Sequence, residues 1–512
     1  MSLVVFVVVT LGLAGLAIAL RGRQRWAIST AMAGLVLAVV AAIAIDPAQT
    51  VAIGDGGLVA GAYLRLFLIL GSIVALGLTI AGLAAGTQRD APAVTLAMLG
   101  ATALTLALVD PRAAVLAATA GGLFGVLVAL GTEDRRVGAT VGILEIRAVA
   151  VSGALAIAAT AWLGRDLSHL EATTVVFGLA YLAFPVAVAM RFGAIPFHLW
   201  AARLTDVVPE TALPILTVLA PASLAVVALA WLDASVVPLA LNLAPERGIV
   251  LAIAIASIWL AAVAAVVQDD VEHILGYSIV ADAGVIVLAL AALTPEAAAP
   301  ARTWILAFVV ARAALAAWTA GIRAGFLTGR VADLHGWARR SPILAVGFGL
   351  MMLATVGLPG FASFDARASV VGLALFEPVT TIVRIATLAP ILYYGRLLVI
   401  GLLPPDRIGE PVNPWRPRVA RPDVTAVRRW LRVTWLANMA FTTASIGLLL
   451  GALALATAVG GFGGPTAAAA PPPTISRTGA SPASTPSSSP SANAPASASS
   501  SPAPLSSASA AP

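Results

Sequence analysis

Long apolar runs alternate with short polar segments along almost the whole chain. The runs are continuous and do not alternate residue by residue, so each predicts a helix and the pattern argues against a closed β-barrel. A helix of about 20 apolar residues crosses the roughly 30 Å hydrocarbon core of a bilayer. The pattern therefore predicts an all-α, polytopic membrane protein. Its fourteen predicted spans are 3–20, 27–45, 60–85, 93–109, 113–131, 138–163, 172–190, 211–232, 248–267, 274–293, 303–322, 343–364, 370–402 and 434–460.

Proline and glycine interrupt two of these spans close to a charged residue. Pro185 and Pro196 bracket Arg191, and a Pro-Gly pair at 359–360 precedes Arg367. Proline frees a backbone carbonyl and bends a helix, which is tolerated at membrane depth only where protein or a water-lined cavity satisfies the freed groups. Two such segments far apart in the sequence predict two related halves with broken helices.

The composition agrees with this class and excludes others. The chain is 60% hydrophobic and 11% charged, whereas a soluble domain carries roughly a quarter charged residues. Cysteine is absent, which excludes disulfides, thiolate metal sites and cysteine catalysis. The net charge of +6 comes from arginines that lie between apolar runs, so nucleic acid is not an expected partner. All 30 basic residues are arginine, and there is no lysine.

Arginine placement predicts the orientation and the domain organisation. If the loop after the first span is cytoplasmic, alternate connections on that side carry eighteen arginines and the opposite side carries five. Both termini are then expected outside the cytoplasm, in a protein of the cell membrane. Residues 1–464 form the predicted membrane domain, and 403–433 form a basic cytoplasmic loop within it. Residues 465–512 are rich in Ser, Pro and Ala and predict a disordered extracytoplasmic tail.

Ionisable side chains inside the predicted spans are the best leads to function, because each costs roughly 2.5–3.5 kcal/mol at mid-bilayer. These residues are Arg65, Glu145, Arg147, Arg191, Asp282, Arg312, Asp365, Arg367, Arg384 and Arg396. Structural ion pairing or snorkelling is the favoured interpretation of Arg65, Arg384 and Arg396. The stronger functional candidates are Arg191, Asp282, Arg312 and Arg367.

Four segments between residues 190 and 400 carry a resemblance to a known family. They are residues 191–200 (Arg-Phe-Gly-Ala-Ile-Pro-Phe-His-Leu-Trp), 270–278 (Asp-Val-Glu-His-Ile-Leu-Gly-Tyr-Ser), 357–367 (Gly-Leu-Pro-Gly-Phe-Ala-Ser-Phe-Asp-Ala-Arg) and 393–396 (Tyr-Tyr-Gly-Arg). In order and spacing they resemble motifs of the antiporter-like subunits of proton-pumping NADH–quinone oxidoreductase, or respiratory complex I. Subunit N is the most similar, and subunits M and L and the large subunits of multi-subunit sodium/proton antiporters share the pattern.

The resemblance implies an architecture and a set of partners. It implies about fourteen transmembrane helices with two inverted repeats, an antiporter-like core at about 93–402, and a polar axis that carries protons. The partners would be other membrane subunits of a respiratory complex. No cofactor is expected on this chain, which would be an enzyme only as part of an oxidoreductase and would have no redox site or metal site of its own. The residues expected to line the axis are Arg191, His198, Asp282, Arg312 and Arg367.

The sequence also departs from the family pattern. Arg191 and Arg367 stand where the family has lysines, Leu224 stands at the position of the central lysine, and the predicted span 113–131 has no acidic residue. A desolvated lysine can release its proton, whereas arginine stays charged in proteins. The two arginines can therefore act as fixed charges that gate a water path or hold carboxylates such as Asp282, but they cannot relay protons.

Three functions remain open from the sequence. The leading hypothesis is an antiporter-like membrane subunit involved in proton translocation coupled to electron transport, with Asp282 and His198 as the titratable members of its path. The alternatives are a non-conducting assembly paralogue and a stand-alone cation/proton antiporter. No Gly-rich phosphate loop, His-Glu-x-x-His motif or nucleophile elbow supports a soluble enzyme.

Overall fold

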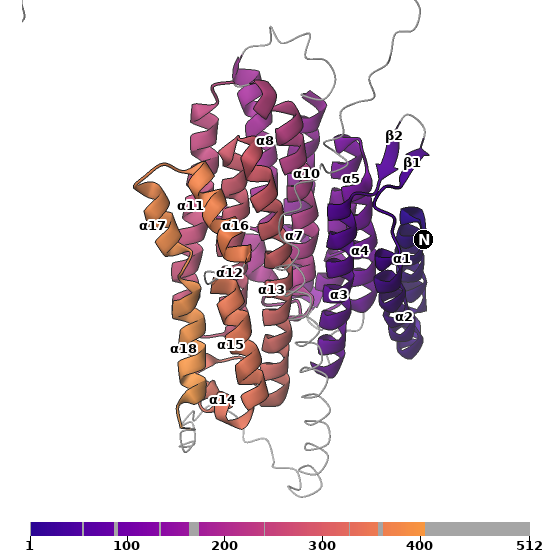
Figure 1. Cartoon of the computed structure of the whole chain (residues 1–512). Coiled ribbons are helices and arrows are strands. Elements are labelled where there is room, and N and C mark those ends of the chain that lie inside the picture. The colour runs from indigo at the N-terminus through magenta and orange to yellow at the C-terminus, as the bar shows by residue number, and fades with distance from the viewer. Residues whose placement is uncertain are drawn as a thin grey trace, which may run out of the picture. The chain divides into compact units, whose positions relative to one another are not determined.

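The computed structural model describes residues 2–53, 56–85, 91–132, 135–162, 174–239, 241–326, 328–356 and 362–404. These residues fold almost entirely into helices (Figure 1). They belong to one compact unit, Met1–Ala470. The predicted span 434–460, the predicted tail and all but the first two residues of the predicted basic loop lie outside the described residues.

Every predicted span inside the described ranges contains helix. Ten helical segments there are long and apolar enough to cross a membrane, and three further apolar helices are shorter. This confirms a multi-pass, all-α membrane protein. In chain order the helices are α1 (Leu3–Ala19), α2 (Gln24–Ile43), α3 (Ala62–Ala85), α4 (Ala91–Ala107), α5 (Pro111–Leu123), α6 (Val126–Leu130), α7 (Arg135–Trp162), α8 (Thr174–Phe192), α9 (Leu199–Leu204), α10 (Ala220–Ser235), α11 (Ala244–Val267), α12 (Val271–Ala292), α13 (Ala298–Phe326), α14 (Trp337–Arg340), α15 (Pro342–Val356), α16 (Ala362–Ala374), α17 (Val379–Ala386) and α18 (Pro390–Leu402).

One predicted boundary is wrong. The sequence pattern places separate spans at 343–364 and 370–402, but α16 runs through the predicted gap and ends at Ala374. The chain then turns at residues 375–378, before α17 begins. Three of these four turn residues are apolar or proline (Leu-Phe-Glu-Pro), so hydropathy alone does not mark the turn, but the Glu377-Pro378 pair predicts a break in the stretch 343–402 and the structure has it there.

A small β-hairpin joins α2 to α3, in a segment for which the sequence predicted no span. Strands β1 (Thr50–Ile53) and β2 (Gly56–Val59) pair antiparallel, with Thr50 opposite Val59. The hairpin is fixed to the helices by a hydrogen bond from the Val109 N–H to the Gly57 carbonyl at 3.1 Å.

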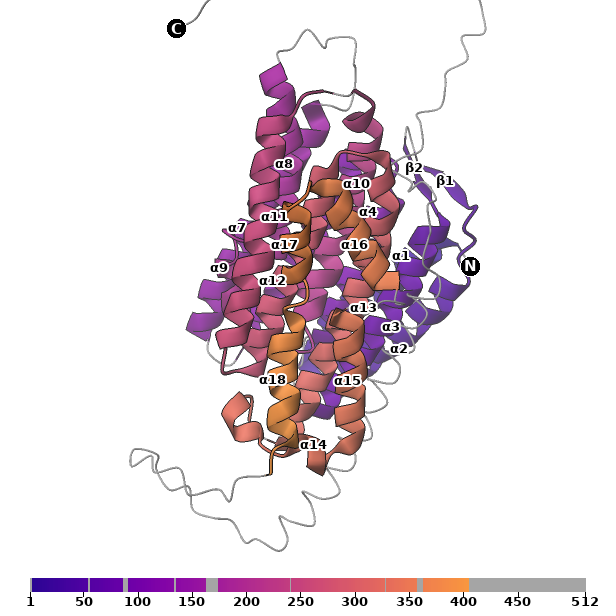
Figure 2. The ribbon, with the colours of Figure 1, turned by 60° about the vertical axis from the view of Figure 1, so that its left-hand side comes forward.

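Three long helices form the buried centre, and the others surround them. The segments that contain α10, α12 and α13 are almost wholly buried, and α3 packs against α13 to join the N-terminal helices to the rest (Figure 1). Helix α11 packs along α12, and α17 lies against α11 (Figure 2). The outer helices expose large apolar side chains such as Leu392 and Val399 of α18. Such faces suit hydrocarbon, because lipid tails are as apolar as leucine.

Candidate functional site

The interruption after α8 places Arg191 in the last turn of a helix. Gly193 has a φ of +66°, the left-handed conformation that glycine adopts without cost. The N–H of Gly193 donates to Met190 at 3.1 Å and the N–H of Ala194 donates to Ala189 at 2.8 Å, which is a Schellman termination. The predicted break near Arg191 is therefore present, and glycine rather than proline ends the helix.

The backbone groups freed by this break have partners. The indole N–H of Trp200 donates to the Met190 carbonyl at 2.9 Å, and the N–H of Ile195 donates to the Ser257 hydroxyl at 3.0 Å. Within a membrane an unsatisfied backbone group costs several kcal/mol, so irregular backbone persists only where such partners exist. The break is thus a supported feature of the fold, and it directs Arg191 toward the interior.

A first charge centre lies between α7 and α8. We use the name α7–α8 centre for Glu145, Arg191 and the helix break between α5 and α6 that packs on these two side chains. Both side chains are buried, at 2% exposure each, and their opposite charges interact electrostatically. Within the described residues, Oε2 of Glu145 and both Nη atoms of Arg191 have no hydrogen-bond partner. The sequence listed Glu145 among the ionisable residues in spans but did not pair it with Arg191.

A second charge centre, the α12–α13 network, joins Asp282, Arg312, Ser278 and Tyr394. Arg312 is fully buried and donates to Oδ2 of Asp282 through Nε at 3.1 Å and also through Nη2. Its Nη1 donates to the Ser278 hydroxyl at 2.8 Å and to the Tyr394 hydroxyl at 2.6 Å. Asp282 and Arg312 lie near the middle of their helices. Among the arginines that the structure describes, Arg312 is the one that hydrogen-bonds Asp282, and Arg367 interacts with this carboxylate only electrostatically.

Arg367 of α16 has a different environment from the one predicted. Its guanidinium group donates to the carbonyl of Val356, the last residue of α15. It also donates to the carbonyl of Thr387, which follows α17, at 3.2 Å. It also lies over the Trp304 ring, 5.5 Å from the ring centroid. A cation at a helix C-terminus is favoured by the unsatisfied carbonyls and by the helix dipole. Arg367 thus holds two helix ends together.

Two other arginines bind helix C-termini in the same way. Arg247 donates to the carbonyls of Ala291, near the end of α12, and Ala374, the last residue of α16, at 2.8 and 2.9 Å. Arg396 donates to Val266, in the last turn of α11, at 2.7 Å. The planar guanidinium fork reaches two acceptors at once, which a lysine ammonium does less well. The structural interpretation of Arg396 agrees with these contacts.

His198 lines a small, partly open cavity between the α8–α9 break and α12. Phe192, Tyr277 and His273 also line it, so it is mostly apolar with two imidazoles. Nε2 of His273 lies 3.2 Å from Oδ1 of Asp206. His273 lies 75 residues after His198 in the chain, and this separation gives no sign that both imidazoles face one cavity.

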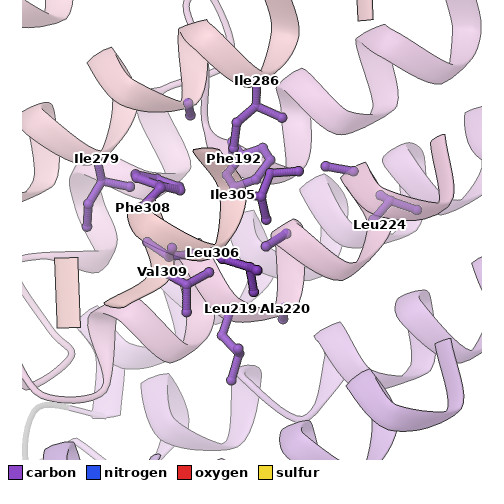
Figure 3. Packing of buried hydrophobic residues seen from close by; sticks show 14 of the residues in the cluster. Phe192, Leu219, Ala220, Leu224, Ile279, Ile286, Ile305, Leu306, Phe308 and Val309 are labelled. Atoms are coloured by element: carbon purple, nitrogen blue, oxygen red, sulfur yellow. The ribbon is translucent and has the colours of Figure 1, made fainter. Parts of the chain in front are cut away.

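Buried apolar side chains form a cluster that includes neighbours in sequence of both charge centres (Figure 3). Phe192 directly follows Arg191, and its ring centroid is 6.1 Å from that of Phe308, one turn before Arg312. Leu224, at the position of the family's central lysine, is buried in the same cluster. The other labelled members are Leu219, Ala220, Ile279, Ile286, Ile305, Leu306 and Val309.

The structure distributes the predicted axis residues over four places. Asp282 and Arg312 share one network, Arg191 lies in the α7–α8 centre, and Arg367 binds helix ends. His198 lines the cavity beside the α8 break. Sequence reasoning did not single out Ser278 and Tyr394 as ligands of Arg312, although both fall inside motifs quoted for the resemblance.

Comparison with known proteins agrees with this arrangement. Residues 151–391 match the family described as NADH:quinone oxidoreductase/Mrp antiporter, TM. NADH-quinone oxidoreductase subunit N of Halorhodospira halophila is 29% identical over 239 residues, which cover 45% of this chain and 48% of that protein. The matched region thus spans about half the length of the curated relatives.

Solved structures share the fold over a larger part of the chain. A chain of the Mrp complex from Dietzia sp. DQ12-45-1b superposes with a TM-score of 0.69 at 19% identity, covering 91% of this chain and 96% of that one. A chain of respiratory complex I from Thermus thermophilus gives a TM-score of 0.63 at 19% identity, with 87% and 97% coverage. Residues 151–391 therefore match the antiporter-like transmembrane domain of the NADH:quinone oxidoreductase/Mrp antiporter family, this part of the chain is similar to subunit N, and the solved structures show the same fold.

Proposed function

We propose that this chain is an antiporter-like membrane subunit of an NADH–quinone oxidoreductase-type complex, where it takes part in proton translocation coupled to electron transport. The observation that carries the proposal is the α12–α13 network. It holds a carboxylate and a guanidinium near the middle of two membrane-spanning helices, within the domain that matches the family. Ionisable groups at that depth are expensive and are generally kept for ion pathways.

The proposed path uses fixed and titratable charges separately. Asp282 and His198 are the members proposed to exchange protons, whereas Arg191, Arg312 and Arg367 stay charged. The arginines therefore set the local field and hold the carboxylate, and protons move through water and carboxylates. Hopping along a chain of lysines is not available to this sequence, which has none.

The proposal includes partners and an orientation. The relatives are named as subunits of multi-subunit complexes, so we place this chain beside other membrane subunits, which would carry the NADH, flavin and quinone chemistry. We place it in the cell membrane with both termini outside the cytoplasm. The support is the excess of eighteen arginines over five on the two sets of connecting segments.

The test is to replace Asp282 by Asn in the reconstituted complex and to measure proton uptake together with quinone reduction. We expect less proton uptake per quinone reduced. Asp365→Asn is the matched control, because Asp365 is an exposed carboxylate on the neighbouring broken helix. The amount of assembled complex is measured for each variant, so that lost coupling is separated from lost assembly. Unchanged coupling in the Asp282 variant would remove this residue from the path.

A non-conducting assembly subunit is the second candidate, and the apolar cluster favours it. Leu224 and the other labelled members of the apolar cluster carry no titratable group, and Arg367 serves as a helix-end ligand. If this candidate is right, proteoliposomes containing the chain show no ion flux under any pH gradient, and the complex does not assemble when the gene is deleted. A third candidate, a stand-alone cation/proton antiporter, rests on the shared fold with a chain of the Mrp complex and predicts active protein after purification without partners.

A further inference from the structure

Arg147 is an exposed arginine near the middle of a membrane-spanning helix. Helix α7 begins at Arg135 and ends at Trp162, whose side chain is 68% exposed. Arginine flanks spans on the cytoplasmic side and tryptophan favours the membrane–water interface, so these ends fix the depth of the helix. Arg147 lies twelve residues after Arg135 and fifteen before Trp162, which is about 18 Å and about 22 Å at 1.5 Å per residue. Its guanidinium group therefore starts close to the midplane of the bilayer.

The described part of the chain does not neutralise this charge. Within the described residues, Arg147 forms no hydrogen bond and no ion pair. Glu145 is only two residues away, but residues at this spacing do not face each other on a helix, and Glu145 is buried on the side of Arg191. The predicted span 434–460, outside the described residues, contains no aspartate or glutamate, and every other acidic residue outside the described ranges lies in a connecting segment. A counter-charge at the depth of Arg147 must therefore come from another molecule.

The surface around Arg147 suits a second helix. We use the name Arg147 face for Ile143, Arg147, Ala150, Ala154 and Ala158, which are all exposed and follow one another at spacings of three or four residues along α7. Alanines four residues apart let two helix backbones approach closely, a pattern typical of contacts between transmembrane helices. With its other sides α7 packs on α5, α6, α8 and α9.

The depth of the charge favours a protein helix over a lipid headgroup. Arg384 of α17 is also exposed, but it lies only five residues after Val379, where its span begins, so its side chain can extend to the interface. Arg147 has about 15 Å of hydrocarbon on either side, which an arginine side chain spans only in part. Such groups pair with a charge inside the membrane, so the Arg147 face calls for a carboxylate at the same depth.

We propose that the Arg147 face binds a transmembrane helix of another subunit, and that this helix carries an aspartate or glutamate at mid-membrane depth that pairs with Arg147. The alanines bring the two backbones close, and the guanidinium fork binds the carboxylate through two parallel hydrogen bonds. The inference rests on the part of the proposed function that places this chain beside other membrane subunits, and not on proton translocation.

A second copy of this chain fits the Arg147 face less well. Such a copy offers Asp365 of α16, an exposed carboxylate on a broken helix. A contact between α7 of one copy and α16 of the next joins two different surfaces, so it repeats in a ring or an open array instead of closing in a dimer. One different subunit satisfies the charge without such repetition.

The first test uses the absence of cysteine from the chain. A nitroxide label is attached to Ala154→Cys in the purified complex in lipid nanodiscs, and its collision rate with oxygen is measured by electron paramagnetic resonance, with the signal of the labelled wild-type complex subtracted. Leu392→Cys is the matched control, because Leu392 is a 63% exposed residue in the middle of another span. We expect a several-fold lower collision rate at 154 than at 392. Loss of the subunit on labelling at 154 but not at 392 would also support an occupied face, whereas equal rates would overturn the proposal.

The second test concerns the charge itself. Arg147→Gln leaves the partner's carboxylate unpaired, so we expect several-fold less of this subunit to co-purify with the complex, whereas Arg147→Lys retains most of it. Arg384→Gln is the control and should leave the amount unchanged. Protease resistance of the subunit in the membrane separates lost binding from lost folding. If the face is turned to lipid, removal of a mid-membrane charge makes insertion easier and leaves co-purification unchanged, which would refute the proposal.

A suppressor experiment identifies the partner. In the Arg147→Gln background, each mid-span aspartate or glutamate of the other membrane subunits is changed to Asn or Gln, and one of these changes should restore co-purification, because removal of both charges leaves neither unpaired. Restoration by none of them would refute the pairing, and restoration by Asp365→Asn would show that a second copy binds there instead. A proton-moving complex that retains the Arg147→Gln subunit normally would refute this inference alone. A complex that depends on Arg147 but moves no protons would refute the proposed proton translocation alone.

Discussion

Removing one charged partner of the α12–α13 network should lower the free energy of unfolding much more than removing both partners. Asp282→Leu leaves the fully buried Arg312 without its counter-charge, and Arg312→Met leaves the Asp282 carboxylate without its two hydrogen bonds. Removing one partner of a buried ion pair typically costs about 3–5 kcal/mol, because the other charge stays desolvated. Each single variant is therefore expected to lose about 3–5 kcal/mol of the free energy of unfolding.

The double variant should be close to the wild type. Replacement of a buried ion pair by apolar side chains of similar volume is often neutral or stabilising. The structure supplies a further reason, because the Tyr394 hydroxyl donates to the Ser278 hydroxyl at 2.8 Å and these two groups keep each other as partners when Arg312 is gone. The summed cost of the single variants, about 6–10 kcal/mol, then mostly disappears in the double variant.

The measurement is equilibrium unfolding in mixed detergent micelles, followed by tryptophan fluorescence, for the wild type, both single variants and the double variant. The coupling energy from this double-mutant cycle isolates the pair. If the two single costs are each below about 1 kcal/mol, as for a solvent-exposed pair, or if they simply add in the double variant, the network is not the desolvated pair described above.

Three further changes test the helix ends and the close contacts. Arg367→Gln should lower the free energy of unfolding by about 1.5–3 kcal/mol, because it removes charge-assisted hydrogen bonds to two helix ends. Arg367→Lys should have an intermediate effect. Equal stability of both variants and the wild type would contradict this. Gly193→Ala should cost about 1–2 kcal/mol, because its φ of +66° is left-handed, and no change in the unfolding midpoint would exclude strain there. Gly284→Ala should lower the free energy of unfolding by about 1–3 kcal/mol in the same assay, because its Cβ would lie 2.9 Å from the Ala254 carbonyl oxygen. In the control Gly349→Ala, the new Cβ meets nothing within 4 Å, so this variant should be nearly neutral.

The sequence predicts the fold well because one physical rule dominates it. A helix must be long and apolar enough to cross hydrocarbon, and this rule locates each described span to within a few residues at most ends. It places a boundary wrongly at 365–369, which lies inside α16, and hydropathy alone does not mark the turn at 375–378 because that turn is itself largely apolar. The β-hairpin is too short to produce a clear alternation, so the pattern gives no sign of it.

The charged residues could be identified from the sequence, but their partners could not. Asp282 and Arg312 are 30 residues apart on adjacent helices, and only the packing of α12 on α13 brings them together. Glu145 faces Arg191 because two glycines on a third segment leave the space. The contacts of Arg367 require the positions of two helix ends, which hydropathy locates only within several residues. The roles of these residues in proton transfer stay predictions.

The apolar cluster has an electrostatic consequence for the charges beside it, because Phe192 directly follows Arg191 and contacts Phe308, one turn before Arg312. Aliphatic and aromatic side chains weaken Coulomb forces far less than water does, since the effective dielectric constant falls from about 80 to roughly 4–20. A change of charge on one side of such packing therefore acts on the other side as a shift in electric potential, even where no hydrogen bond joins the two sites.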